Sequence, residues 1–185
     1  MSYLSFEESI AKGKVGELIV KQDFLDFLNI KYQDVTNCQQ FQVIDTDYLA
    51  SVGGRLEVKS NYKDKKELVI EDFTDYRPEI GKTSLGWFEK TQANLIIFVS
   101  PTTRAMIFMP MTQRLKMHYW KIRNEYQLIR NMATTNKYSD VWQSAYRRIP
   151  FSALRGFISV YKKLDDEPPK PVFKPVQLTM FSNRR

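Results

Sequence analysis

The sequence predicts an α/β protein in which a mixed β-sheet is flanked by helices. Three observations lead to this class. Apolar residues recur at helical spacing near the N-terminus, short apolar runs typical of strands follow, and a helix-like segment separates two of these runs. The 185 residues, 43% of them hydrophobic, match the size and core of one domain. We therefore expect a single domain over residues 1–164 and a separate tail over residues 165–185.

The first predicted element is a helix over residues 5–30. Gly13 and Gly16 lie inside it, and paired glycines in a helix often allow another backbone to come close. Glu17 follows directly and would lie beside that approach. The apolar residues with helical spacing are Phe6, Ile10, Val15, Leu18, Ile19, Phe24, Leu25 and Leu28.

Two strands joined by a hairpin are predicted next. The first covers residues 41–47 and carries Asp45 and Asp47, and the second begins after the two-glycine turn at residues 53–54. Side chains alternate between the faces of a strand. Asp45 and Asp47 would therefore share one face, as would Glu57 and Lys59, while the intervening apolar residues of the second strand would point into the core.

The rest of the chain up to residue 164 alternates between strand-like and helical segments. Continuous apolar runs predict buried strands, and the region after residue 110 is basic, aromatic and helical in character. The expected elements are strands at 67–73, 94–100 and 104–110, a short helix within 84–93, a long basic helix at 111–133 and a helical or mixed element at 151–164.

Charge and composition restrict the class of partner and the compartment. A formal net charge of +7 favours polyanions such as nucleic acid. The single cysteine, Cys38, excludes an internal disulfide framework and suits a reducing compartment. No apolar stretch approaches the roughly 20 residues that span a bilayer. We expect a soluble, cytoplasmic protein without a membrane partner.

The acids on the predicted hairpin suggest a metal site. Asp47 and Glu57 would converge, which is unfavourable unless a cation lies between them. Mg²⁺ commonly binds through one or two carboxylates, and Mn²⁺ accepts the same ligands. Lys59 could orient an attacking water and offset negative charge on a phosphate. These parts together indicate phosphodiester hydrolysis, whereas the alternative for Glu57 and Lys59 alone is a solvated surface ion pair.

This pattern resembles the PD-(D/E)XK nuclease superfamily over residues 5–110. Asp47 corresponds to the first acid, Glu57 and Lys59 to the E-x-K motif, and Glu17 to the glutamate that the family usually adds from its first helix. The chain departs from the family in lacking a proline before the first acid, and Asp45 competes with Asp47 for that role. The resemblance implies a restriction-endonuclease-like core with Glu17, Asp47, Glu57 and Lys59 as catalytic residues.

The same resemblance implies that Asp47, Glu57 and Glu17, with Asp45 as the alternative, hold the metal. Basic residues after position 110 would neutralise DNA phosphates without reading sequence. Glu71, Trp87 and Gln92 could line the substrate groove, although burial in the core is an equal expectation for Trp87. His118, the only histidine, is expected to be structural. The candidates for DNA binding are Arg114, Lys116, Lys121, Arg123, Gln92 and Trp87.

The tail over residues 165–185 is rich in proline, which favours an extended chain. Its segment QLTMF resembles the pentapeptide by which bacterial replication and repair proteins dock on the β sliding clamp. A flexible tether with a compact apolar anchor suits such docking. The alternative is that the apolar residues pack back on the domain. The docking residues would be Gln177, Leu178, Met180 and Phe181.

The expected function is therefore a metal-dependent DNA nuclease, endonucleolytic and structure-selective, acting in replication, recombination or repair in bacteria or a bacterial virus. A homodimer is left open, since members of this superfamily often cut both strands as dimers. Three alternatives remain. The chain could be a non-catalytic DNA-binding or clamp-associated protein that retains the fold, a restriction-type endonuclease with a recognition region in residues 111–164, or a viral inhibitor of the clamp.

Overall fold

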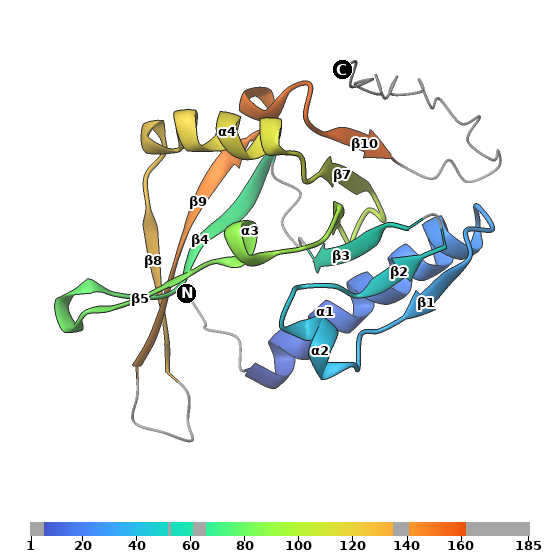
Figure 1. The fold of residues 1–185 in the computed structure, drawn as a ribbon, viewed down its shortest axis with the longest axis horizontal. Coiled ribbons are helices and arrows are strands. Elements are labelled where there is room, and N and C mark those ends of the chain that lie inside the picture. Colours follow the sequence, from blue (N-terminus) through green and yellow to red (C-terminus); the bar gives the residue numbers. More distant parts are fainter. Residues whose placement is uncertain (1–5, 52, 61–65, 135–140, 162–185) are drawn as a thin grey trace, which may run out of the picture.

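The computed structural model describes residues 6–51, 53–60, 66–134 and 141–161, which form a sheet of six strands and another of four (Figure 1). The larger sheet has the order β1-β2-β3-β6-β7-β10, and its pairs are antiparallel apart from the parallel pair β3–β6. This confirms the predicted α/β class with a mixed sheet flanked by helices. The strands of the larger sheet are β1 Tyr32–Asp34, β2 Tyr48–Ala50, β3 Arg55–Ser60, β6 Leu95–Val99, β7 Met106–Pro110 and β10 Ser159–Tyr161.

The smaller sheet is antiparallel throughout, with the order β5-β4-β9-β8. The sequence predicted only one sheet, and of these four strands only the first part of β4. The chain returns from residue 141 to pair with β4, a long-range contact that no local pattern indicates. The strands are β4 Glu67–Arg77, β5 Lys82–Leu85, β8 Ile129–Thr134 and β9 Val141–Pro150, with a 3-10 turn at Pro78–Ile80 between β4 and β5.

Helix α1, Phe6–Val20, packs against β3 and β6 and continues as a π-helix over Lys21–Asp26. Gly16 allows the close approach that the sequence predicted, because a Cβ there would lie 2.0 Å from the Ser60 hydroxyl and 2.9 Å from a methyl of Val99. Gly13 has no atom within 4 Å of such a Cβ, so the prediction is wrong for this position. The buried face of the helix joins Leu56 and Val58 of β3 in one apolar core.

The expected strand over residues 41–47 is wrong. Residues Gln39–Gln42 form the short helix α2, and Asp45 has a left-handed φ of 50°. The amides of Phe41 and Gln42 donate to the carbonyl of Cys38, and these bonds make the stretch a helical turn. The predicted hairpin does form, but between β2 and β3, so that β2 begins directly after Asp47.

A second core lies between the smaller sheet, strands β6 and β7, and two helices. Helix α3, Trp87–Lys90, and helix α4, Gln113–Ile122, contribute buried aromatic and aliphatic residues to it. In its buried part the hydroxyl of Tyr119 and the guanidinium of Arg147 both donate to Asp72, which links α4, β9 and β4. The members with the least exposure include Leu68, Ile70, Phe88, Ile96, Met109, Leu115, Tyr119, Ile149 and Leu154.

The predicted long helix over residues 111–133 is correct only in its first half. Thr112 caps α4 by accepting a hydrogen bond from the Leu115 amide, and the helix ends at Ile122 with a 3-10 turn over Arg123–Glu125. The following residues pair with β9 as strand β8, so pairing in the sheet overrides the helical pattern. The described part of the predicted element at 151–164, residues 151–161, is mixed as expected, with a 3-10 turn at Phe151–Leu154 before β10.

In the part of the chain that the structure describes, no helix is long and apolar enough to cross a membrane. The predicted tail over residues 165–185 lies outside the described residues.

Candidate active site

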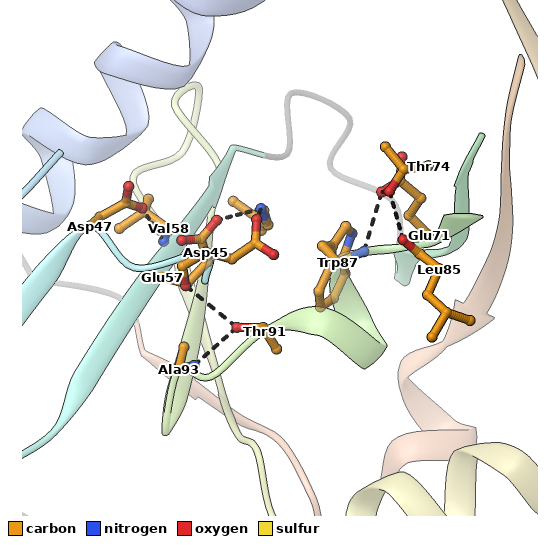
Figure 2. A network of polar contacts seen from close by, with 11 residues as sticks. Asp45, Asp47, Glu57, Val58, Glu71, Thr74, Leu85, Trp87, Thr91 and Ala93 are labelled. Carbon is orange, nitrogen blue, oxygen red and sulfur yellow. Dashed lines mark hydrogen bonds and ion pairs between the residues drawn. The ribbon is translucent and has the colours of Figure 1, made fainter. Parts of the chain in front are cut away.

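Strand β3 presents Glu57 and Lys59 on one face, as predicted, because Leu56 and Val58 occupy the apolar core on the other. Asp47 lies in the bend directly before β2 and is hydrogen-bonded to β3. The Val58 amide donates to Oδ2 of Asp47 over 2.7 Å (Figure 2), and the Asp47 amide donates to the Leu56 carbonyl over 2.8 Å. Hydrogen bonds between β3 and the residue before β2 therefore hold the two acids of the predicted motif near each other.

Lys59 lies between two of the acids. Its ammonium forms an ion pair with Oε1 of Glu57 and lies 3.8 Å from Oδ1 of Asp45. The side chain of Glu57 is only 7% exposed, whereas that of Lys59 is 26% exposed. The lysine is therefore the member of the pair that solvent, and a substrate, can reach.

Burial and mutual repulsion disturb the ionisation of the acids. Burial raises the pKa of Asp47 to about 6, with the Val58 amide opposing this shift and Glu17 adding to it. Burial likewise raises the pKa of Glu57 to about 7, against the effect of Lys59 and with a contribution from Asp47. Carboxylates with strongly perturbed pKa values cluster at functional sites, and they also occur in structural ion-pair networks.

Glu17 of α1 belongs to the same electrostatic cluster. Burial raises its pKa, and the charges of Asp34 and Glu57 add to the shift, while Lys14 opposes it. The hydroxyl of Tyr48, next to Asp47, donates to the Glu17 carbonyl over 3.1 Å and ties α1 to β2. Asp34 of β1 was not predicted, since nothing in its local sequence indicates that β1 lies beside this helix.

The ammonium of Lys59 remains charged despite its surroundings. Burial alone would lower its pKa, but Glu57 and Asp45 outweigh burial and raise it. A lysine held in this way acts as a permanent cation and hydrogen-bond donor at neutral pH rather than as a general base.

Strand β4 and helix α3 contribute further residues to the site, Glu71 and Trp87 (Figure 2). Oε2 of Glu71 accepts hydrogen bonds from the Trp87 amide over 3.3 Å and from the Thr74 hydroxyl over 3.4 Å. The ring centroid of Trp87 lies 5.5 Å from the Lys59 ammonium. Trp87 is only 9% exposed and belongs to the second core, so the core expectation for this residue is confirmed.

The segment after α3 fixes the loop that carries the acids. The Gln92 amide donates to the Ile44 carbonyl over 3.1 Å, and the buried Thr91 hydroxyl donates to the Asp45 carbonyl over 3.4 Å. Gln92 itself is exposed, and its side-chain oxygen accepts from Arg55 over 2.9 Å. Thr91 was not predicted, because its role depends on a contact between distant parts of the chain.

The donor set suits Mg²⁺ or Mn²⁺, both of which prefer carboxylate oxygens. Burial is the main cause of the raised pKa values of Asp47, Glu57 and Glu17, and repulsion adds to it, from Glu57 at Glu17, from Glu17 at Asp47 and from Asp47 at Glu57. A cation among the three carboxylates would relieve this repulsion. Within the described ranges no three histidine, cysteine or acidic side chains are arranged as a preformed metal cage.

No family model, curated protein or solved structure matches this chain. The chemical interpretation therefore depends on the geometry of the acids and the lysine.

Helix α4 carries three of the six residues predicted to bind DNA, Arg114, Lys116 and Lys121. Arg114 and Lys121 are exposed, whereas Lys116 donates to the Glu89 carbonyl over 3.4 Å. The guanidinium of Arg123 lies 3.4 Å from the ring centroid of Trp120, which is itself partly exposed.

His118 has a structural contact, as expected, since its Nε2 lies 2.7 Å from the Ala153 carbonyl. The predicted docking residues Gln177, Leu178, Met180 and Phe181 lie outside the described residues.

Proposed function

We propose that this protein is a Mg²⁺- or Mn²⁺-dependent DNA nuclease that hydrolyses phosphodiester bonds, endonucleolytically and with selectivity for DNA structure. The observation that carries the proposal is that Asp47, hydrogen-bonded to β3, lies near Glu57 and Lys59 of that strand, with both acids at raised pKa. The resemblance to the PD-(D/E)XK superfamily assigns the same three residues to the reaction.

Each side chain has a chemical role consistent with its position. Asp47 and Glu57 would bind the metal, Glu17 would assist directly or through a water, and Asp45 is the alternative ligand. The bound ion supplies Lewis acidity at the phosphate oxygens. The ammonium of Lys59 would orient the attacking water and donate a hydrogen bond to the phosphate, where negative charge develops in the transition state.

Sequence-independent DNA binding follows from charge. The net charge of +7 attracts the phosphate backbone, and α4 offers exposed basic side chains at Arg114 and Lys121. Such contacts position a duplex or a junction without reading its bases. Selectivity would then come from DNA shape, as in a Holliday-junction resolvase.

The direct test incubates purified protein with labelled linear, circular, single-stranded, flap and four-way-junction DNA. Each substrate is tested with Mg²⁺, with Mn²⁺ and with chelator, beside the Lys59→Ala variant. Metal-dependent cutting that Lys59→Ala abolishes supports the proposal, and the preferred substrate defines the role. Absence of cutting on every substrate with either metal overturns it.

A second candidate is a non-catalytic DNA-binding or clamp-associated protein that retains the fold. It is favoured by one observation: Lys59 already neutralises Glu57. Asp47→Ala separates the two candidates. Loss of cleavage with preserved DNA binding supports the nuclease, whereas DNA binding without cleavage by both the variant and the parent protein supports the accessory role.

The β sliding clamp remains a proposed partner of the tail. A synthetic peptide covering residues 175–183 would compete with a known clamp ligand in fluorescence anisotropy. The matched control is the same peptide with Gln177→Ala and Phe181→Ala. Equal competition by both peptides, or none by either, would remove this partner. Displacement of host ligands from the clamp by the full-length chain would favour the viral inhibitor.

A further inference from the structure

The ring of Trp87 is a fixed surface beside the Lys59 ammonium. The indole packs edge-on against Phe98, with ring centroids 5.9 Å apart, and against Phe88 at 5.7 Å. Phe98 lies directly opposite Lys59 in the parallel pairing of β3 with β6. The aromatic face and the lysine are therefore held by the same pair of strands, and their 5.5 Å separation falls within the range of a cation–π contact.

The backbone of Trp87 is clamped to the smaller sheet by Glu71. The carboxylate accepts the Trp87 amide and the Thr74 hydroxyl, and the Gly86 amide donates to the Asp72 carbonyl over 2.8 Å. The fit is so close that a Cβ on Gly86 would lie 2.1 Å from the Glu71 carbonyl oxygen. Only glycine allows the chain to enter α3 this near to β4.

These contacts between β4 and the start of α3 lie at an irregularity of β4. The register of β4 against β9 shifts between Glu71 and Phe73, so the strand bulges where Gly86 and Trp87 meet it. Bulges commonly occur next to active sites, where they redirect a side chain. Here the Glu71 side chain is directed to the amide at the start of α3 (Figure 2).

We propose that Glu71 and Trp87 are positioning residues that hold the Lys59 ammonium in the active site, an inference that rests on the proposed nuclease function. A series of contacts runs from the Glu71 carboxylate to the Trp87 amide, and from the Trp87 ring to the Lys59 ammonium. A lysine side chain has four flexible carbon–carbon bonds and loses its position readily when unsupported. A metal bound by Glu57 would compete with Lys59 for that carboxylate, and the ring of Trp87 would then hold the ammonium together with Asp45.

The decisive comparison is between Trp87→Phe and Trp87→Leu. Phenylalanine keeps an aromatic face for the ammonium, whereas leucine fills the core without one. We expect Trp87→Phe to retain kcat within a few-fold, and Trp87→Leu to lower kcat on the order of 10- to 100-fold with KM nearly unchanged, since small displacements of a catalytic group have effects of this size. A purely structural tryptophan would give the same loss in both variants, which would overturn the proposal.

The matched control is Tyr76→Leu. Tyr76 lies on the same strand as Glu71 and contacts a different cation, the Arg130 guanidinium, 4.8 Å from its ring centroid. This variant removes a cation–aromatic contact that does not reach Lys59, and kcat should stay at the parent value. A loss of kcat equal to that of Trp87→Leu would show that any damage to β4 lowers the rate and would overturn the specific role.

Glu71 is tested in the same way. Glu71→Gln keeps an oxygen that can accept the Trp87 amide, whereas Glu71→Ala removes it. The glutamine variant should restore most of the kcat that the alanine variant loses. Equal loss in both variants would mean that the negative charge, and not the hydrogen bond to Trp87, is the property that matters.

A readout without catalysis separates this inference from the proposed function. In chelator, the acetylation rate of Lys59 by acetic anhydride, relative to exposed Lys121, is followed by mass spectrometry. Trp87→Leu and Glu71→Ala should raise this ratio several-fold, and Trp87→Phe should not. An unchanged ratio overturns the positioning role even if DNA is cut. A parent protein that cuts no DNA but gives the expected ratios overturns only the nuclease assignment.

Discussion

Lys59 forms an ion pair with Glu57, two residues earlier on the same face of β3. The pairing places a cation where the predicted mechanism needs one and neutralises the most buried acid of the cluster. It also couples the ionisation of the two residues.

Replacing Lys59 by methionine should raise the pKa of Glu57 above its value of about 7. In the parent protein the Lys59 ammonium favours the charged carboxylate, and the variant lacks this effect. Glu57 would then be largely protonated at neutral pH, and Mn²⁺ would bind more weakly at pH 7 than at pH 9. Carboxyl ¹³C NMR titration in chelator measures the shift directly. A Glu57 pKa that stays constant or falls would show that the ion pair contributes nothing in solution.

Asp47 should make the protein less stable as the pH rises. Its pKa is raised from 3.8 to about 6 by folding, so the folded state binds the proton more tightly. The stabilising effect of protonation is complete below about pH 4 and is lost as the pH rises through about 6. Asp47→Asn should therefore be more stable than the parent at pH 8, by on the order of 1–2 kcal/mol.

Thermal unfolding followed by circular dichroism between pH 4 and pH 8, in chelator, tests the Asp47 prediction. For a chain of this length, each kcal/mol of added stability raises Tm by roughly 2–4 °C. The two proteins should converge near pH 4. A variant that is less stable than the parent at pH 8 would contradict the prediction.

The two glycines of α1 should respond oppositely to alanine. Gly13→Ala meets no atom within 4 Å and should stabilise the protein by about 0.5–1 kcal/mol, as expected for a helix interior. Gly16→Ala would press on Ser60 and Val99 and should destabilise by roughly 1–3 kcal/mol. Urea unfolding of the two variants provides the comparison. Equal effects would mean that α1 does not pack on β3 and β6 as described.

Neutralising Arg114 and Lys121 should weaken DNA binding uniformly across sequences. Removing one phosphate-binding side chain should reduce the slope of log K against log salt by about 1, because fewer counterions are released. Fluorescence anisotropy in chelator, at several salt concentrations, measures the slope for Arg114→Gln and Lys121→Gln. Lys82→Gln on β5 is the charge-matched comparison, and an equal change there would argue against α4 as the interface.

The local parts of the site could be predicted from the sequence, and the contacts between distant segments could not. Alternation along β3 placed Glu57 and Lys59 on one face, and the glycine pair fixed the hairpin. Asp45 was wrongly placed in a strand because its left-handed φ depends on the turn after α2. The pattern of apolar residues at 41–44 is equally compatible with a strand and with the helical turn that forms.

The smaller sheet was missed for a different reason. Strand β9 is specified by pairing with β4, and β8 by pairing with β9, and the sequence of β4 gives no indication of its partner. The contact of Trp87 with Lys59 was missed in the same way, since it requires α3 to be clamped to β4. Residues 111–133 combine helical spacing in their first part with a strand in the second, and the sheet decides the outcome.

The register of β4 against β9 sets Glu67 opposite Pro150, which joins two distant parts of the described chain. Strand pairs so far apart in sequence form slowly, since a long loop must close before any contact is gained. On a translating ribosome β9 also emerges long after the acids of the hairpin. The carboxylates can therefore assemble on the nascent chain before the sheet that supports Trp87 exists, and synthesis itself delays the completed active site until the last strands have emerged.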